Sequence, residues 1–333
     1  MTQTVPHPPD QKVPPSRTRH PGSATVTHAI AHYGILIATL MLFIALSLAN
    51  SRFLTQRNLL NIVDQQAALG IIACAVTLTV IAGGFDLSVA AVYALSGVIA
   101  AKTAIAWGPL PGLIMAILSG LAIGAVNGLL VTVGRIQSFI ATLATSIVVR
   151  GIALVVTGGF VLTVSDEAFG KLGTERFAQL RYPGWILLAF MVVTWIILHH
   201  STFGRYIFAV GGNPEAARLS GIRVNLVRFS TFVIAGGAAG LAGMIDVSRV
   251  SSAQAGIGVG MELTAIAAIV IGGTSILGGE GAIWRTVCGV TFLALVSNGF
   301  NILGINPVYQ QIFQGLLILA AISMAAWAHR QSR

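Results

Sequence analysis

The sequence predicts an all-α protein, a polytopic transmembrane helical bundle with about ten spans. Hydrophobic residues make up 55% of the chain and charged residues 9%, against about 25% charged residues in soluble domains. Apolar runs long enough to cross about 30 Å of hydrocarbon recur along the chain. The runs are continuous rather than alternating, and only helices or closed barrels satisfy every backbone group inside lipid. Helices are therefore expected throughout the membrane part.

The N-terminal segment has a different composition. Residues 1–28 contain six of the 11 prolines and three basic residues. A segment so poor in apolar residues cannot build a core, which predicts a disordered cytoplasmic tail ahead of a transmembrane domain over residues 29–333. The apolar run after the tail lacks a small-residue cleavage site. It is expected to be a retained first helix rather than a secretory signal.

The apolar runs place ten spans in order along the chain. They are predicted at 33–50, 67–84, 87–107, 110–133, 139–157, 183–200, 229–248, 262–279, 284–301 and 309–328. With the N-terminus in the cytoplasm, the cytoplasmic segments hold eleven basic residues and the outer segments seven. This is the bias that the positive-inside rule describes, and it places both termini in the cytoplasm.

Five spans in each half would give the two halves opposite orientations, as inverted repeats have in many transporters. Ile81-Ala82-Gly83-Gly84 at the end of the second span is similar to Val270-Ile271-Gly272-Gly273 in the eighth. This internal echo is short, and chance is the alternative to a repeat.

The longest outer segment, residues 158–182, is rich in charged residues. We expect a solvated connecting loop there, and a docking site for an external partner is the alternative.

A polar segment between the sixth and seventh spans contains a short helix with both ends marked. Asn213 is expected to cap its N-terminus, with Pro214 at the first helical position, where no N–H is needed. Glu215 in the first turn and Arg218 near the last suit the helix dipole, and Gly221 can take the left-handed conformation that ends a helix. A helix of about two turns is not stable alone in water. We therefore expect it to dock on a cytoplasmic partner.

One predicted span carries a polar stripe. Ser138, Thr142, Thr145 and Arg150 recur at helical spacing. An arginine inside a span costs about 2.5–3.5 kcal/mol on insertion scales, so Arg150 is expected to face the bundle interior. The stripe is a candidate wall of a polar path. The alternative is structural, with hydroxyls bonded to their own helix and the arginine snorkelling outward or paired with a carboxylate.

Residues 272–281 contain five glycines together with Thr274 and Ser275. Such a segment makes a poor straight helix, and it predicts either a broken or re-entrant segment or a tight loop at the membrane surface. Asp86 is expected to cap the third span. Asn298 precedes a glycine near the end of the ninth span.

The sequence lacks the residues that several other functions would require. The chain has no Gly-x-x-x-x-Gly-Lys-Ser/Thr motif and only three lysines, so no loop for ATP phosphates is expected. No His, Cys and Asp cluster has metal-ligand spacing, and Cys74 and Cys288 are expected to be small buried hydrophobes. No catalytic residue, metal site or cofactor is therefore predicted. Few carboxylates lie deep in the spans, which disfavours a proton relay.

Four blocks of the sequence carry a resemblance to a known family. They are Gly83-Gly84-Phe85-Asp86-Leu87-Ser88-Val89, Phe139-Ile140-Ala141-Thr142-Leu143-Ala144, Gly211-Gly212-Asn213-Pro214-Glu215-Ala216-Ala217-Arg218 and Ile271-Gly272-Gly273-Thr274-Ser275. With these blocks the chain resembles the permease subunits of bacterial ABC importers for monosaccharides, the ribose-type permeases. The resemblance covers nearly the whole chain except the tail. Ala90 and Ala144 depart from it, since the family usually has glycine there.

The resemblance implies a transport subunit of the bacterial inner membrane rather than an enzyme. A cytoplasmic ATP-binding subunit would hydrolyse ATP, a periplasmic protein would deliver the sugar, and a second permease copy or a homologous permease would complete the assembly. The segment 201–228 would carry the coupling helix. The residues expected to couple to the ATPase are Gly211, Asn213, Pro214, Glu215, Ala216, Ala217, Arg218 and Gly221. The residues expected along the translocation path are Asp86, Ser138, Thr142, Thr145, Arg150, Thr274, Ser275 and Asn298.

Two other functions stay open as alternatives. A branched-chain amino-acid ABC permease would share the general design, and the Asn-Pro-Glu-Ala-Ala-Arg segment favours sugar. A self-sufficient secondary transporter or channel would need no docking helix and would show acidic residues at the midplane.

Overall fold

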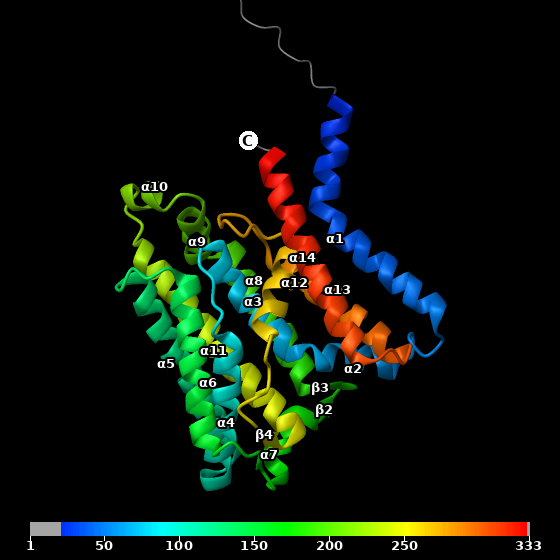
Figure 1. The fold of residues 1–333 in the computed structure, drawn as a ribbon, viewed down its shortest axis with the longest axis vertical. Coiled ribbons are helices and arrows are strands. Elements are labelled where there is room, and N and C mark those ends of the chain that lie inside the picture. Colours follow the sequence, from blue (N-terminus) through cyan, green and yellow to red (C-terminus); the bar gives the residue numbers. More distant parts are fainter. Residues whose placement is uncertain (1–20, 332–333) are drawn as a thin grey trace, which may run out of the picture. The chain divides into compact units, whose positions relative to one another are not determined.

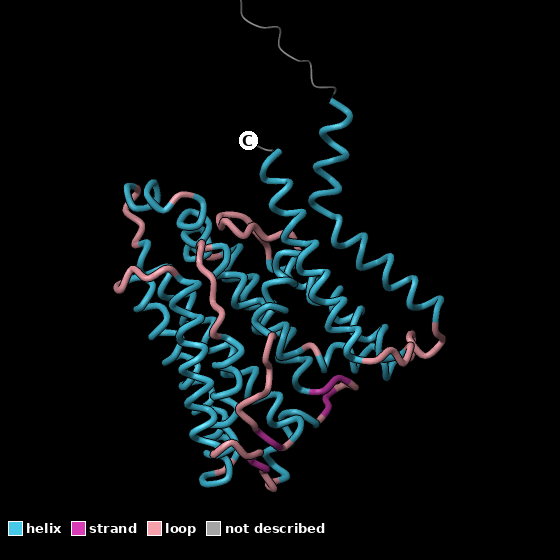
Figure 2. Tube along the Cα trace, in the orientation of Figure 1, coloured by secondary structure: helices cyan, strands magenta, loops and turns pink. Residues whose placement is uncertain are grey.

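The structure, a computed structural model, describes residues 21–331 and is mostly helical (Figures 1 and 2). The chain divides into two units, Met1–Gly34 and Ile35–Arg333, and the second holds every feature discussed below. The tail predicted over residues 1–28 lies outside the described residues as far as residue 20. Helix α1 (Pro21–Ala49) begins earlier than the predicted first span.

Within residues 21–331, six helices are long and apolar enough to cross a membrane. They are α4 (Val89–Trp107), α5 (Pro109–Thr132), α6 (Ser138–Thr157), α8 (Tyr182–His200), α11 (Val224–Val250) and α13 (Ile283–Ile302). Helices α2 (Gln56–Gln65) and α3 (Ala67–Ile81) meet at a bend of 47° and form a seventh span if they are taken together. A mostly helical protein with several helices able to span a membrane is thus confirmed.

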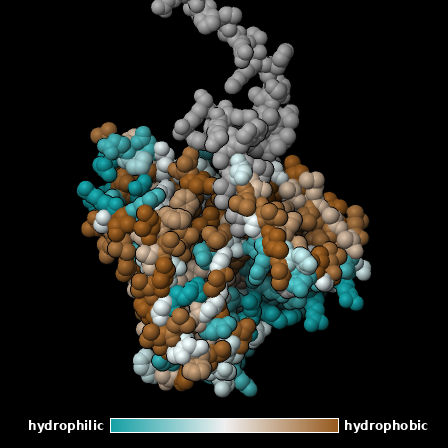
Figure 3. Space-filling view, viewed as in Figure 1, coloured by the Kyte–Doolittle hydropathy of each residue, from teal (hydrophilic) through white to brown (hydrophobic). Residues whose placement is uncertain are grey.

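The remaining predicted spans correspond to α1, to α12 (Met261–Ile271) and to α14 (Pro307–Gln331). Helix α12 has 11 residues, which gives a length of only about 16 Å. The count of ten spans therefore stays a prediction. Figure 3 shows apolar side chains over the flanks of the bundle and polar side chains gathered around α10 (Pro214–Leu219).

Helix α11 is the centre of the bundle, packed against α3, α4 and α5. Glycines make the contact with α5 close: a Cβ on Gly120 would overlap the backbone of Gly236, and a Cβ on Gly124 would overlap the backbone of Phe232. The spacing of small residues in the sequence favours such helix packing. Gly120 and Gly124 of α5 therefore serve the contact between the two helices.

Helices α3 and α12 end in the same way. Each stops at an isoleucine, Ile81 or Ile271, two residues before a glycine with positive φ. The capping hydrogen bonds are Gly83 N–H to Val80 O (2.9 Å) and Gly84 N–H to Thr79 O (2.9 Å), matched by Gly273 N–H to Val270 O (2.8 Å) and Thr274 N–H to Ile269 O (3.1 Å). The internal echo in the sequence therefore has a structural counterpart, but its register differs by one residue, because Gly83 matches Gly273.

The echo does not support an inverted repeat. In the ten-span order, α3 and α12 are the second and eighth spans, which run in the same direction, whereas five plus five inverted spans would pair the second with the seventh. The inverted repeat stays a prediction.

The segment 158–182 is more ordered than a connecting loop. It contains α7 (Glu167–Thr174) and a hairpin of β2 (Arg176–Phe177) with β3 (Leu180–Arg181), while β1 (Leu162–Thr163) pairs antiparallel with β4 (Ser252–Ala253). Phe169 of α7 is fully buried, and the N–H of Gly173 donates to Ser248 Oγ at 2.9 Å. Most of the charged side chains of the segment are exposed, as expected. The expectation of a plain connecting loop was wrong, because one aromatic side chain and a buried hydrogen bond hold α7 on α11.

Candidate functional site

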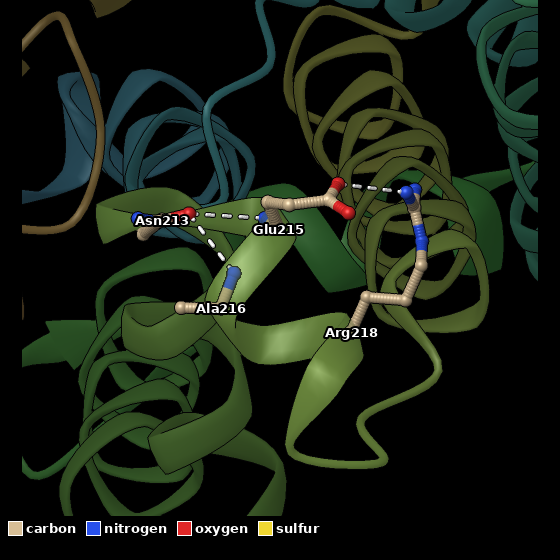
Figure 4. A network of polar contacts seen from close by, with 4 residues as sticks. All are labelled: Asn213, Glu215, Ala216 and Arg218. Atoms are coloured by element: carbon tan, nitrogen blue, oxygen red, sulfur yellow. Dashed lines mark hydrogen bonds and ion pairs between the residues drawn. The ribbon is translucent and has the colours of Figure 1, made fainter.

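The predicted helix between the sixth and seventh spans is present as α10, which follows α9 (Thr202–Gly212). Asn213 Oδ1 accepts hydrogen bonds from the N–H groups of Glu215 and Ala216, each at 3.0 Å (Figure 4). Pro214 occupies the first helical position, as expected. Two of the backbone donors that a helix start leaves unpaired are therefore satisfied by one side chain.

The C-terminus of α10 is also built as predicted. Gly221 has φ +83°, its N–H donates to Arg218 O at 3.0 Å, and the N–H of Ile222 donates to Ala217 O at 3.0 Å. This pair of bonds is the Schellman arrangement, which requires a left-handed residue. Sequence signals within nine residues thus define both ends of α10.

Helix α10 touches the bundle on one side only. Ala217 is 4% exposed and packs in a cluster with Ile207, Val210 and Val224. Glu215 and Arg218 form an ion pair of 3.0 Å on the other side, with 70% and 61% of their side chains exposed, where such a pair adds little stability. The outer face of α10 is therefore a preformed polar surface with no contact to the rest of the chain that the structure describes.

The end of α9 is wedged between two other segments. A Cβ on Gly211 would collide with the carbonyl of Ile81 and the backbone nitrogen of Gly279. The N–H of Gly279 itself donates to Ile81 O at 2.8 Å, and Arg228 Nε donates to Ala82 O at 3.3 Å. The end of α9 therefore meets the end of α3 and the loop after α12 at one point.

The loop after α12 is not helical over residues 272–282. Helix α12 ends at Ile271, earlier than the predicted eighth span. Thr274 is buried, and its Oγ1 has no hydrogen-bond partner in the described structure. The N–H of Ser275 donates to Glu280 O at 3.1 Å, which closes the loop on itself. The helix is broken here and a packed turn contacts α3 and α9, while a re-entrant segment and a tight loop at the membrane surface both stay predictions.

The segment 82–88 between α3 and α4 is also non-helical, and α6 holds it. Ser138 Oγ accepts from the N–H of Phe85, and Thr142 Oγ1 accepts from the N–H of Leu87, each at 3.0 Å. These two hydroxyls accept hydrogen bonds from backbone N–H groups that would otherwise be unpaired inside the bundle.

Asp86 does not cap α4. The N-cap of that helix is Ser88, and Asp86 Oδ1 accepts from the N–H of Ser88 at 2.9 Å and from its hydroxyl at 2.6 Å. Asn127 of α5 donates to Ser88 Oγ at 2.7 Å. The expectation that Asp86 caps the third span was therefore wrong. Its carboxylate instead closes a turn just before α4, and the hydrogen bond from Asn127 of α5 holds that turn in place.

The predicted polar stripe of α6 is divided among different contacts. Thr145 Oγ1 donates to Ala141 O of its own helix at 3.0 Å. Arg150 Nη1 donates to the carbonyls of Ala255 at 2.7 Å and Ile257 at 3.3 Å, on the loop that follows β4. Arg150 thus faces protein, as expected, and its partners are backbone carbonyls rather than a carboxylate.

The other predicted path residues lie at two ends of the bundle. Asp86, Ser138, Thr142, Thr274 and Ser275 lie on the two non-helical segments or contact them, near the coupling segment. Asn298 of α13 lies at the opposite end, where it exchanges hydrogen bonds with Asn58 of α2 at 2.8 and 3.2 Å. The structure does not bring the eight residues into one lining.

A second polar group was missed in the sequence. Tyr93 of α4 and Asp246 and Arg249 of α11 meet beside a cavity of about 350 Å³ at the end of α11 remote from α10. The signal present was the i, i+3 spacing of Asp246 and Arg249 at the end of a predicted span. Tyr93 is distant in the sequence, so only the fold reveals it.

Taken together, these features define a polytopic helical membrane protein with a short, capped and exposed helix at one end. A family model described as "Branched-chain amino acid transport system / permease component" matches residues 58–322, and the chain belongs to this family. The predicted membership in a family of ABC importer permeases is thus confirmed.

Named relatives resemble the chain over most of its length. The ribose import permease protein of Escherichia coli strain K12 is 42% identical over 292 residues, 86% of this chain and 91% of the relative. The ribose import permease protein of Bacillus subtilis is 39% identical over 292 residues, which cover 87% of this chain and 91% of the relative. An L-arabinose ABC transporter permease protein of Azospirillum brasilense is 35% identical over 326 residues, 98% and 95%. No solved structure matches the chain.

Proposed function

We propose that this chain is the membrane-spanning permease subunit of an ATP-driven importer that carries a monosaccharide. The named relatives are ribose and arabinose permeases. The observation that carries the proposal is the position of α10, whose exposed outer face adjoins the point where α9, the end of α3 and the loop after α12 meet. The chain transports, and a separate cytoplasmic subunit hydrolyses ATP.

The contacts support a mechanical role for α10. When the ATP-binding subunits close, they would move α10 and, through Asn213, the end of α9. Gly211 packs tightly against Ile81 and Gly279. A displacement of α9 would therefore pass directly to the end of α3 and to the loop after α12. The two non-helical segments, 82–88 and 272–282, would shift together and open or close the path on the α10 side. The residues proposed to couple to the ATPase are Gly211, Asn213, Pro214, Glu215, Ala216, Ala217, Arg218 and Gly221.

This mechanism implies an orientation. The α10 end would face the cytoplasm together with both termini, in a bacterial inner membrane crossed by ten spans. The opposite end carries α7, the β2–β3 hairpin and β4, and it would face the periplasm, where a sugar-binding protein delivers its load. The exposed apolar flanks would contact lipid and a second permease copy or a homologous permease.

The family description keeps a branched-chain amino acid as the alternative substrate. The sugar permeases cited above match with 35–42% identity over most of their length, which favours sugar. A self-sufficient transporter is not favoured, because an exposed helix with capped ends would then have no role.

The test is reconstitution. The chain would be assembled with its ATP-binding subunit and its sugar-binding protein, in vesicles loaded with ATP. We expect ATP-dependent accumulation of labelled D-ribose or L-arabinose and none of L-leucine. The chain alone should hydrolyse no ATP and accumulate no sugar. Uphill uptake by the chain alone, driven by a proton gradient, would refute the proposal.

A further inference from the structure

A cavity of about 350 Å³ opens where α11 ends, and α4 and the segment after α11 form its walls. In Figure 1 this end of α11, near β4, is remote from α10. The volume falls in the range of roughly 300–1,000 Å³ that is typical of small-molecule sites. Its polar groups come from Tyr93, Asp246, Arg249, Ser252 and Gln254.

The charged groups of the cavity are paired with each other. Asp246 Oδ2 accepts from Tyr93 Oη at 2.7 Å, and Asp246 Oδ1 lies 2.9 Å from Arg249 Nη2. Only 14% of the Asp246 side chain and 25% of the Arg249 side chain are exposed. The cavity therefore presents strong donors and acceptors without net charge. A free amino acid would bring two charges, neither of which finds an unpaired counter-charge here.

Asp246 and Arg249 keep unused hydrogen-bonding positions that a ligand could occupy. A carboxylate accepts about four hydrogen bonds and a guanidinium donates five. Asp246 uses two acceptor positions, and Arg249 uses two of its donors, one of them toward Asp64 O at 3.3 Å. The side chains of Ser252 and Gln254 form no hydrogen bond with any described residue. Neighbouring hydroxyls of a sugar match this set, since each hydroxyl both donates and accepts.

The wall of the cavity is held in place from α6. Arg150 binds the carbonyls of Ala255 and Ile257, and Ile257 lines the cavity. Gly258, with φ +72°, brings the same segment against the ring of Tyr93. The site is therefore preformed by three elements, which lowers the ordering cost of binding.

We propose that this cavity is a binding site for a neutral monosaccharide at the end of the permease remote from the coupling helix. The proposal rests on the proposed function and adds to it the groups that hold the sugar: Asp246 accepts from its hydroxyls, while Arg249 and Gln254 donate to them.

Protection of a reporter cysteine tests the site. Val250 lines the cavity and is 59% exposed, so Val250→Cys in the full chain, in membrane vesicles, would be reacted with a maleimide. D-ribose or L-arabinose should slow the labelling, and L-leucine should not. Leu219→Cys on α10, 83% exposed, should label at the same rate with and without sugar.

A second substitution links the protection to the polar groups. Gln254→Ala or Ser252→Ala in the Val250→Cys background should raise the half-protecting sugar concentration about 2- to 10-fold, the effect of one lost hydrogen bond. Gln311→Ala, an exposed glutamine elsewhere, is the matched control and should leave it unchanged.

Uptake by the assembled transporter, measured in parallel, separates the two proposals. Sugar uptake with no protection of Val250→Cys overturns the site and leaves the proposed function standing. Protection without uptake supports the site and counts against the proposed function. Equal protection by L-leucine overturns the preference for a neutral sugar.

Discussion

The backbone N–H of Gly279 donates a hydrogen bond to the carbonyl of Ile81 across 2.8 Å. This bond joins the loop after α12 to the end of α3, the two places with matching helix caps. Gly211 packs on both partners of the bond. A coupling segment in this position can act on two membrane segments at once.

Gly211→Ala should therefore reduce stability and transport more than Gly212→Ala does. The new Cβ would collide with two backbone groups that cannot move independently, and overpacking of this kind costs about 1–3 kcal/mol. We expect a lower melting temperature and reduced ATP-driven uptake. Gly212→Ala is the matched control, because nothing lies within 4 Å of its Cβ position. Equal behaviour of the two variants would show that the close approach is unimportant.

The outer face of α10 should couple without being needed for folding. Glu215→Lys and Ala216→Trp change exposed positions, so expression and delivery of sugar by the binding protein should persist while sugar-stimulated ATP hydrolysis is lost. Ala217→Trp should instead destabilise the chain, since Ala217 is 4% exposed.

A cysteine at position 216 gives the topology of the same helix. It should cross-link to the ATP-binding subunit and react with reagent from the cytoplasmic side. Labelling from the outer side alone would invert the orientation and exclude the coupling role.

Thr142→Val should reduce stability through the segment 82–88. The isosteric change leaves the N–H of Leu87 without its acceptor, and an unsatisfied buried donor costs about 1–3 kcal/mol. Thr145→Val is the control, because that hydroxyl bonds only to its own helix. Thermal unfolding in detergent compares them. Indistinguishable melting temperatures would mean that water replaces the Thr142 hydroxyl.

Arg150→Leu should impair folding or transport, because the carbonyls of Ala255 and Ile257 lose a charged donor, worth about 1.5–3 kcal/mol. Arg150→Lys should recover part of the loss by donating to one carbonyl. Ile147→Ala on an exposed face of α6 should have little effect. If Arg150→Leu matched the parent protein in expression and uptake, the hydrogen bonds of Arg150 would be needed for neither folding nor transport.

Local sequence determined those features whose partners are close in the chain. The cap by Asn213, the first turn at Pro214 and the left-handed end at Gly221 involve groups within nine residues, and the structure has all of them. The same holds for the membrane helices, because lipid forces each apolar run to satisfy its own backbone.

Only the tertiary structure decided which distant groups meet. Tyr93 and Asp246 are 153 positions apart, and Gly279 finds Ile81 through a contact between the ends of separate spans. The eight predicted path residues are all polar, yet they do not meet in one lining. A polar side chain needs a hydrogen-bond partner, but its polarity does not specify which partner it finds. Hydrogen bonds act over about 3 Å, so partners on different helices are fixed by packing of whole helices, which no single stretch of sequence encodes.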